Sequence, residues 1–380
     1  MYRSVCERMC RLRSRFNPGT RHSVVMSWCG HRKASCPFFV SPISSDMKEG
    51  TTLALSAVVA ASMIGLARRR TRPLASIASD AFYDGLLPRA LPTFSLPVLK
   101  STERGLVIGM GGGCDVLGAL AVAQAWQQVS EPGATIIFGN CVSPRPMPED
   151  FVQLGPHLWR CPAEVVPLQP ADGAYGSARI EQSLPRGAEG SPLLFIIPRN
   201  GKGSPPPALA DVTAANSCAF ATALAEVRPD RVVGVDLGGD SLTGGVDFES
   251  DPECGRDRQV LHALRASRVP CVHLVLGPGC DGESSMEAMS EAVRRLDSNG
   301  ALLGVLPLDD LIGPMSRHAT TLAPNRTPNI IKAAFERRAK LATQQPQAGG
   351  SDGGLCTICR HGHTAQVPWA WLTVALAFDV

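Results

Sequence analysis

Between residues 101 and 342, short apolar runs alternate with segments of helical periodicity, and this alternation constrains the fold more than any other feature. Apolar runs that predict strands include "GLVIGM", "ATIIFGN", "RVVGVDL" and "VPCVHLVLG". Alternation of this kind builds βαβ units, whose right-handed crossovers make a parallel sheet covered by helices. The sequence therefore predicts an α/β domain that is Rossmann-like, with a mostly parallel sheet and helices on both faces.

The rest of the chain divides by composition. Residues 1–45 are rich in Arg and Ser, which indicates a targeting-like or disordered segment. Residues 51–67 are uncharged and precede three arginines, so they are interpreted as a transmembrane helix or the apolar part of a presequence. We expect a linker at 68–100 that wraps onto the domain, a flexible connector at 343–354, and at 355–380 a C-terminal strand docking on the α/β domain.

The N-terminal region leaves the location open. A mitochondrial or other organellar location and a membrane anchor both fit it, and a cytoplasmic location follows if the segment is not a signal. Without residues 1–45 the chain is slightly acidic, so no nucleic-acid partner is expected. The thirteen cysteines are scattered through predicted strands and helices, which is typical of reduced thiols. The motif "CTICRHGH" (356–363) is too compact for a usual zinc site, so no zinc is expected there.

Three Gly/Asp-rich segments follow predicted strands: "GMGGGCD" (109–115), "DLGGDSLTGG" (236–245) and "GPGCDGE" (277–283). In open α/β sheets, ligands bind at the carboxyl ends of the strands. Glycine turns at helix N-termini favour an anion, and converging carboxylates favour a divalent cation that bridges them to it. The alternative is that each glycine only forms a tight turn and each aspartate only caps a helix.

The three segments yield a candidate site. The expected metal ligands are Asp115, Asp236 and Asp240, and the expected further ligands or general bases are Asp281 and Glu283. Arg256 either clamps the anion or pairs with a neighbouring acid. The glycines expected to bind the ligand are Gly109, Gly111, Gly112, Gly113, Gly238, Gly239, Gly279 and Gly282. Neutralising Asp236 or Asp281 is expected to keep or raise the stability of the metal-free protein, because the carboxylates repel one another.

The expected cofactor is Mg²⁺ or another divalent cation, and NAD is disfavoured. A dinucleotide fingerprint requires G-x-G-x-x-G/A and an acid at the end of the second strand. Here Cys114 occupies the third position, and the second strand ends in "FGN" without an acid. The Gly-Lys-Ser/Thr of a Walker loop is also missing from this turn.

The blocks "GMGGGCDVLGAL", "VVGVDLGGDSL", "GRDRQVL", "GPGCDGE" and "FDV", in that order, resemble those of the domain of unknown function 1152 family. The resemblance covers residues 104–304, with a weaker similarity at 367–379, and Cys114 stands where the family pattern commonly has glycine. It implies a Rossmann-like domain and no particular reaction.

Two functions remain from the sequence. The first is a divalent-metal-dependent enzyme that acts on a small anionic or phosphorylated metabolite. The alternative is a non-catalytic metabolite-binding or membrane-tethered module that uses the same pocket.

Overall fold

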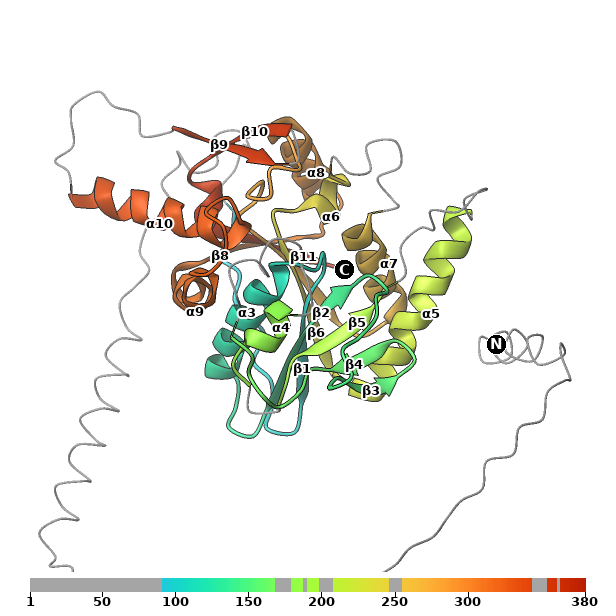
Figure 1. The fold of residues 1–380 in the computed structure, drawn as a ribbon. Helices are drawn as coiled ribbons and strands as arrows, with labels where there is room; N and C mark the ends of the chain where they lie inside the picture. The colour runs from blue at the N-terminus through green and yellow to red at the C-terminus, as the bar shows by residue number, and fades with distance from the viewer. Residues whose placement is uncertain are drawn as a thin grey trace, which may run out of the picture. The chain divides into compact units, whose positions relative to one another are not determined.

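A nine-stranded sheet lies at the centre of the computed structural model, which describes residues 91–167, 179–186, 190–197, 208–245, 255–343, 354–360 and 363–380 (Figure 1). The strand order is β3-β4-β5-β2-β1-β6-β7-β11-β8. These strands are β1 (Arg104–Gly109), β2 (Thr135–Val142), β3 (Val152–Gly155), β4 (Leu158–Arg160), β5 (Leu193–Ile196), β6 (Arg231–Leu237), β7 (Cys271–Leu276), β8 (Leu302–Pro307) and β11 (Val374–Asp379).

The five central strands β5, β2, β1, β6 and β7 are parallel, which confirms the expected mostly parallel sheet. The chain runs from β1 outward through β2 to β5, and then returns to β6 and β7 on the other side of β1. The direction of winding therefore reverses between β1 and β6. In open α/β sheets such a reversal opens a crevice at the carboxyl ends of the strands, where ligands bind.

Helices cover both faces of the sheet, because successive residues of each central strand point to opposite sides. In β1, Val107 packs into one hydrophobic core with α3, α8, α9 and α10, while Leu106 and Ile108 pack into a second core with α5 and α7. The helices are α3 (Asp115–Val129), α4 (Arg179–Ser183), α5 (Leu209–Val227), α6 (Asp240–Thr243), α7 (Arg256–Ser267), α8 (Met286–Ser298), α9 (Asp309–Ala319) and α10 (Thr327–Thr343).

The C-terminal region contains the docking strand expected within residues 355–380, preceded by a hairpin that was not expected. Strands β9 (Leu355–Arg360) and β10 (His363–Pro368) form a separate antiparallel hairpin. Only β11 enters the central sheet, where it lies antiparallel between β7 and β8. Its residues Val374 to Phe378 are all buried, because a strand between two neighbours has both faces covered.

Residues 91–100, which were expected to belong to a linker, lie against the sheet domain. Phe94 donates its backbone N–H to the Val305 carbonyl, and Leu99 is fully buried. The apolar segment 51–67 lies outside the described residues. In the part of the chain that the structure describes, no helix combines the length and the apolar character needed to cross a membrane.

Candidate metal and anion site

Three buried carboxylates meet at the reversal point of the sheet. Asp115 is the first residue of α3, Asp236 lies near the carboxyl end of β6, and Asp257 lies in the first turn of α7. Each offers one oxygen, and these three oxygens all lie within 4.8 Å of one another. In the described part of the chain, this is the group of three potential metal ligands that the structure brings together. Asp115 and Asp236 were expected metal ligands, whereas Asp257 was not.

Backbone N–H groups hold the carboxylates of Asp115 and Asp236 in place. Oδ2 of Asp115 accepts a hydrogen bond from the N–H of Gly111 at 2.6 Å, and Oδ1 accepts from Leu237 at 3.4 Å. Oδ1 of Asp236 accepts from Gly239 at 3.1 Å, and Oδ2 accepts from the N–H of Ser241 at 3.2 Å. Both side chains are therefore fixed before any ligand binds, as a pre-organised ligand set requires.

The Ser241 hydroxyl contacts both the Asp236 carboxylate and the His273 imidazole. The hydroxyl of Ser241 donates to Oδ2 of Asp236, and Nε2 of His273 lies 3.1 Å from the Ser241 Oγ. Burial lowers the pKa of His273 to about 3, so the imidazole is neutral at physiological pH. With Asp236 ionised and the Ser241 proton pointing to it, Nε2 of His273 would be the donor in its contact with Oγ. Such outer hydrogen bonds orient metal-binding carboxylates in known sites.

Gly111 brings the first glycine turn directly against the carboxylates. A Cβ at this position would lie 2.2 Å from Oδ2 of Asp257 and 2.8 Å from Oδ2 of Asp115. Any side chain here would therefore collide with two of the three carboxylates. The signal for Asp257 in the sequence was its place in "GRDR", one residue after Arg256, where a helix start follows the second Gly/Asp-rich segment.

The other expected acids form an outer group beside the three carboxylates. Asp281 is buried, and its Oδ2 lies 2.1 Å from the position of a Cβ on Gly238. Its Oδ1 accepts a hydrogen bond from the N–H of Glu283 at 2.9 Å. A Cβ on Gly245 would lie 3.1 Å from Cβ of Asp240 and 3.3 Å from Oε2 of Glu283. Asp240, an expected metal ligand, thus lies beside the cluster but is not one of the three carboxylates whose oxygens lie within 4.8 Å of one another.

Burial and mutual repulsion make these carboxylates hard to ionise. Burial raises the pKa of Asp115 to about 7, and the charge of Asp240 adds to the effect. Burial likewise raises the pKa of Asp236 to about 7, and here the charge of Asp115 adds. Burial followed by the charge of Asp240 holds the pKa of Asp257 and of Asp281 well above the usual range. A bound cation would offset this cost by favouring the ionised forms.

Arginines approach the same glycine turn from two other elements. Nη1 of Arg256 lies 3.1 Å from the position of a Cβ on Gly112 and donates to Oγ of Ser143 at 3.1 Å. Nη2 of Arg326, just before α10, lies 3.4 Å from the position of a Cβ on Gly113. Within the described residues, the buried Nε of each arginine has no hydrogen-bond partner. Together with the positive end of the α3 dipole, these groups make the turn attractive to an anion.

Arg256 also lies beside the acidic cluster, since its Nε is 4.0 Å from Oδ1 of Asp257. Both roles considered for Arg256 from the sequence therefore remain open. Arg326 was not identified from the sequence. It follows "APN" in a turn far along the chain, and only the fold brings it to residue 113.

The remaining expected glycines lie around the cluster in differing surroundings. A Cβ on Gly109 would lie 2.5 Å from Oδ1 of Asn140. Gly239 packs against Met289 and Val275, and Gly279 packs against Val367, so both face apolar side chains. Gly282 has a positive φ of 73°, as a tight turn requires.

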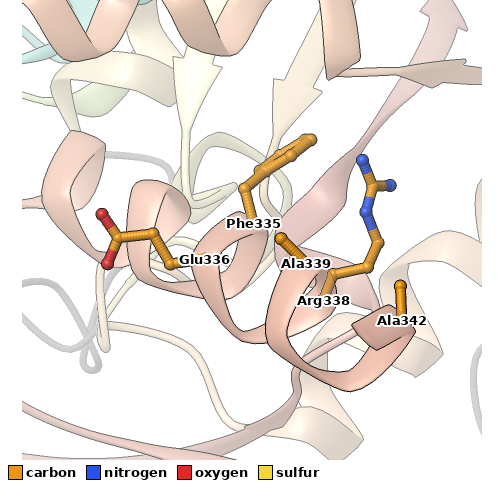
Figure 2. Close-up of a pocket in the computed structure, with 5 residues that line it drawn as sticks. All are labelled: Phe335, Glu336, Arg338, Ala339 and Ala342. Atoms are coloured by element: carbon orange, nitrogen blue, oxygen red, sulfur yellow. The ribbon is translucent and has the colours of Figure 1, made fainter. Parts of the chain in front are cut away.

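Two other features lie apart from this cluster. On β9, Cys356 is buried and Cys359 is exposed, so the two thiols are on opposite sides of the strand, and His361 lies outside the described residues. The expected absence of zinc there stays a prediction. A surface hollow on α10 has a volume of about 490 Å³. Figure 2 shows the residues that line it, which are Phe335, Glu336, Arg338, Ala339 and Ala342. It includes none of the acidic, glycine or arginine residues described above.

Comparison with known proteins locates part of this site in a sequence family. No curated protein and no solved structure matches the chain. A family model matches residues 213–334, which contain Asp236, Asp257, Asp281 and Arg326. The blocks at 109–120 and 378–380, which contributed to the resemblance in sequence, lie outside the matched residues. Residues 213–334 thus carry the pattern of the family described as "Protein of unknown function (DUF1152)", and the resemblance is confirmed over this stretch.

Proposed function

We propose that this protein is a divalent-metal-dependent enzyme that acts on a small anionic metabolite, phosphorylated or carboxylated. The observation that carries the proposal is the close approach of Asp115, Asp236 and Asp257, whose oxygens lie within 4.8 Å of one another beside a glycine turn. Buried carboxylates without a compensating charge are costly, so their convergence favours a cation. The strand order, with its reversal between β1 and β6, supports a Rossmann-like ligand crevice at this place.

The proposed cation is Mg²⁺. Hard divalent cations prefer carboxylate oxygens, and Mg²⁺ commonly uses a few carboxylates together with ligand oxygens and water. Asp115, Asp236 and Asp257 would hold it, with Ser241 and His273 keeping Asp236 in orientation. When bound, the cation supplies Lewis-acid polarisation of a phosphoryl or carboxyl oxygen.

The proposed anion lies on the first glycine turn. Arg256 and Arg326 face Gly112 and Gly113 from two sides, and α3 begins two residues after Gly113. Guanidinium groups bind phosphate and carboxylate through paired hydrogen bonds, so they would orient the ligand next to the cation.

The proposed proton transfer falls to the outer acids. Asp281 is buried with its pKa held well above the usual range, which favours its protonated form and suits a general acid. Glu283 is half-buried, and its backbone N–H donates a hydrogen bond to Oδ1 of Asp281. It therefore lies where a base could contact a ligand at the rim of the cluster.

Calorimetric titration of the metal-free protein with Mn²⁺, repeated with Mg²⁺ and inorganic phosphate, tests the cation site. We expect one cation per chain, and phosphate binding that is tighter when the cation is present. Asp257→Asn should abolish cation binding, whereas Glu291→Gln, an exposed change on α8, should leave it intact. Cation binding by Asp257→Asn with the affinity of the wild type would contradict the proposal.

Asp281→Asn separates the enzyme from the non-catalytic module. In the enzyme, this variant binds Mg²⁺ and phosphate but loses turnover of any phosphorylated metabolite that the wild type converts. Phosphorus NMR of a metabolite panel incubated with Mg²⁺ measures that turnover. Ligand binding by the wild type without conversion of any panel member would instead favour the binding module.

A further inference from the structure

A second pair of buried polar side chains lies beside the glycine turn, on the side of β2. Asn140 belongs to β2 and is the register partner of Gly109 in β1. Glu181 belongs to α4, and both side chains are 0% exposed. Nδ2 of Asn140 donates a hydrogen bond to Oε1 of Glu181 at 2.7 Å. This bond joins two segments 41 residues apart and holds the carboxylate at the carboxyl end of β2.

Each member of the pair keeps one oxygen without a hydrogen bond. Within the described residues, Oδ1 of Asn140 and Oε2 of Glu181 are buried and have no partner. Buried oxygens of this kind are nearly always paired in folded proteins, so two neighbouring exceptions need an explanation. Oδ1 of Asn140 lies 2.5 Å from the position of a Cβ on Gly109, which shows that it faces the start of the glycine turn. Both oxygens are acceptors, so a ligand that satisfies them must present donors.

Two arginines, Arg145 and Arg256, place positive charge near the Glu181 carboxylate. Burial raises its pKa, while the hydrogen bond from Asn140 and the charges of Arg145 and Arg256 act in the opposite direction. Arg256 is also the arginine that faces Gly112. The same guanidinium group therefore acts on the carboxylate of Glu181 and on the turn proposed to hold the anion.

The position of the pair in the sheet indicates what kind of donor it meets. In Rossmann folds that bind dinucleotides through a glycine turn after the first strand, an acid at the end of the second strand accepts hydrogen bonds from ribose hydroxyls. Strand β2 carries no acid at its end, since "FGN" is followed by Cys141 and Val142. In the folded chain α4 supplies the acid instead, and the Asn140 amide holds it in place.

We propose that Asn140 and Glu181 form a subsite for the hydroxyl groups of a phosphorylated sugar, either free or within a nucleotide. The inference rests on the proposed function, because it places the phosphate of the same ligand on the Gly111–Gly113 turn. The order along the sheet edge is then hydroxyl subsite beside β2, phosphate after β1, and cation beside β6.

Paired ligands that differ by one hydroxyl test the subsite on the full-length protein with Mg²⁺. The probes are ribose 5-phosphate against 2-deoxyribose 5-phosphate, and AMP against 2′-deoxy-AMP, each titrated by calorimetry. We expect the hydroxylated member of at least one pair to bind more tightly by about tenfold to a hundredfold, the range for a hydrogen bond to a charged acceptor. The sugar pair and the nucleotide pair distinguish the two sources of the hydroxyl groups.

Glu181→Gln should remove this preference to within about threefold, because the amide retains an acceptor for Asn140 and replaces the free oxygen with a donor. Mn²⁺ binding in the absence of sugar should be unchanged in this variant. Asn140→Ser, which releases Glu181, should weaken the preference in the same direction, and it provides a second measurement if Glu181→Gln does not fold. Glu291→Gln serves as the matched surface control.

The outcomes separate the two proposals. If the wild type binds neither Mn²⁺ nor phosphate, the proposed function is overturned. Retention of both, with equal affinity for each hydroxylated ligand and its deoxy partner, overturns the hydroxyl subsite alone. A preference that persists in Glu181→Gln, or no binding of any of the four probes, also overturns the subsite.

Discussion

Changing Asp257 to asparagine tests whether the three carboxylates form a cation site or a structural network. The change removes one negative charge and keeps the shape of the side chain. Among the described residues, the polar partner of this carboxylate is Arg256, whose Nε lies 4.0 Å from Oδ1. Asp115 and Asp236 each accept backbone hydrogen bonds, so their neutralisation would disturb the fold as well. Asp257 is therefore the cleanest position for the test.

The expected gain in stability follows from the charges. At an effective dielectric constant of about 20, two ionised carboxylates at the 4.8 Å limit repel by about 3.5 kcal/mol, and Asp257 faces two of them. On the same scale, its attraction to Arg256 at 4.0 Å is about 4 kcal/mol. Removing all three interactions leaves a net gain of about 3 kcal/mol for the metal-free variant at a pH high enough to ionise all three carboxylates. For a domain of this size, that corresponds to a rise in Tm on the order of 5 °C.

Thermal unfolding with and without 10 mM Mg²⁺ measures both effects. In the wild type, Mg²⁺ should raise the free energy of unfolding by about 2.7 kcal/mol if its concentration is about a hundred times Kd. The variant should start from a higher Tm and show no rise with Mg²⁺. Its advantage should shrink as the pH falls towards about 4, where an aspartate in the unfolded chain also becomes protonated.

The opposite pattern would refute this reasoning. If Asp257→Asn lowers the Tm of the metal-free protein at pH 8 and keeps the response to Mg²⁺, Asp257 serves mainly to pair with Arg256. The three carboxylates would then be structural. Glu291→Gln, which removes an exposed charge paired with Arg294 at 2.9 Å, should change neither quantity.

Further predictions concern pH, the support of Asp236 and the glycine turn. Folding raises the pKa of Asp115 and Asp236 to about 7, so the contribution of these two groups to metal-free stability is full below about pH 4 and is lost as pH rises through 7; a Tm that rose between pH 5 and 8 without metal would contradict this. Ser241→Ala should weaken Mg²⁺ affinity by about 10- to 100-fold in calorimetry, and unchanged affinity would show that its hydroxyl does not orient Asp236. Asp236→Asn should lower metal-free stability by roughly 1–3 kcal/mol, contrary to the gain expected from sequence, because one amide nitrogen would face donors. Gly111→Ala should lower stability and abolish the Mg²⁺ response, since its Cβ would lie 2.2 Å from a carboxylate oxygen; Gly313→Ala, where nothing lies within 4 Å, should instead raise stability by roughly 0.5–1 kcal/mol.

The sequence by itself determined the architecture and part of the site. The apolar runs that end at Gly109, Leu237 and Leu276 predict parallel strands, because each is long enough for a buried strand and is followed by a helix. Asp115 and Asp236 could be named because they lie within a few residues of the carboxyl ends of β1 and β6. Local chemistry near a strand end is visible in the sequence, and topology brings such ends to one edge.

Only the tertiary structure decided which side chains complete the site. Asp257, Arg326 and Glu181 belong to α7, the turn before α10, and α4, and each reaches the edge of the sheet only after helices have packed on its faces. Likewise, β11 lies between β7 and β8 rather than at an edge of the sheet. These contacts join segments that are distant along the chain, and they depend on how the apolar faces pack rather than on any local pattern. For that physical reason the sequence could predict a Gly/Asp-rich edge, but it could not predict that Asp257 would complete the cluster in place of Asp240.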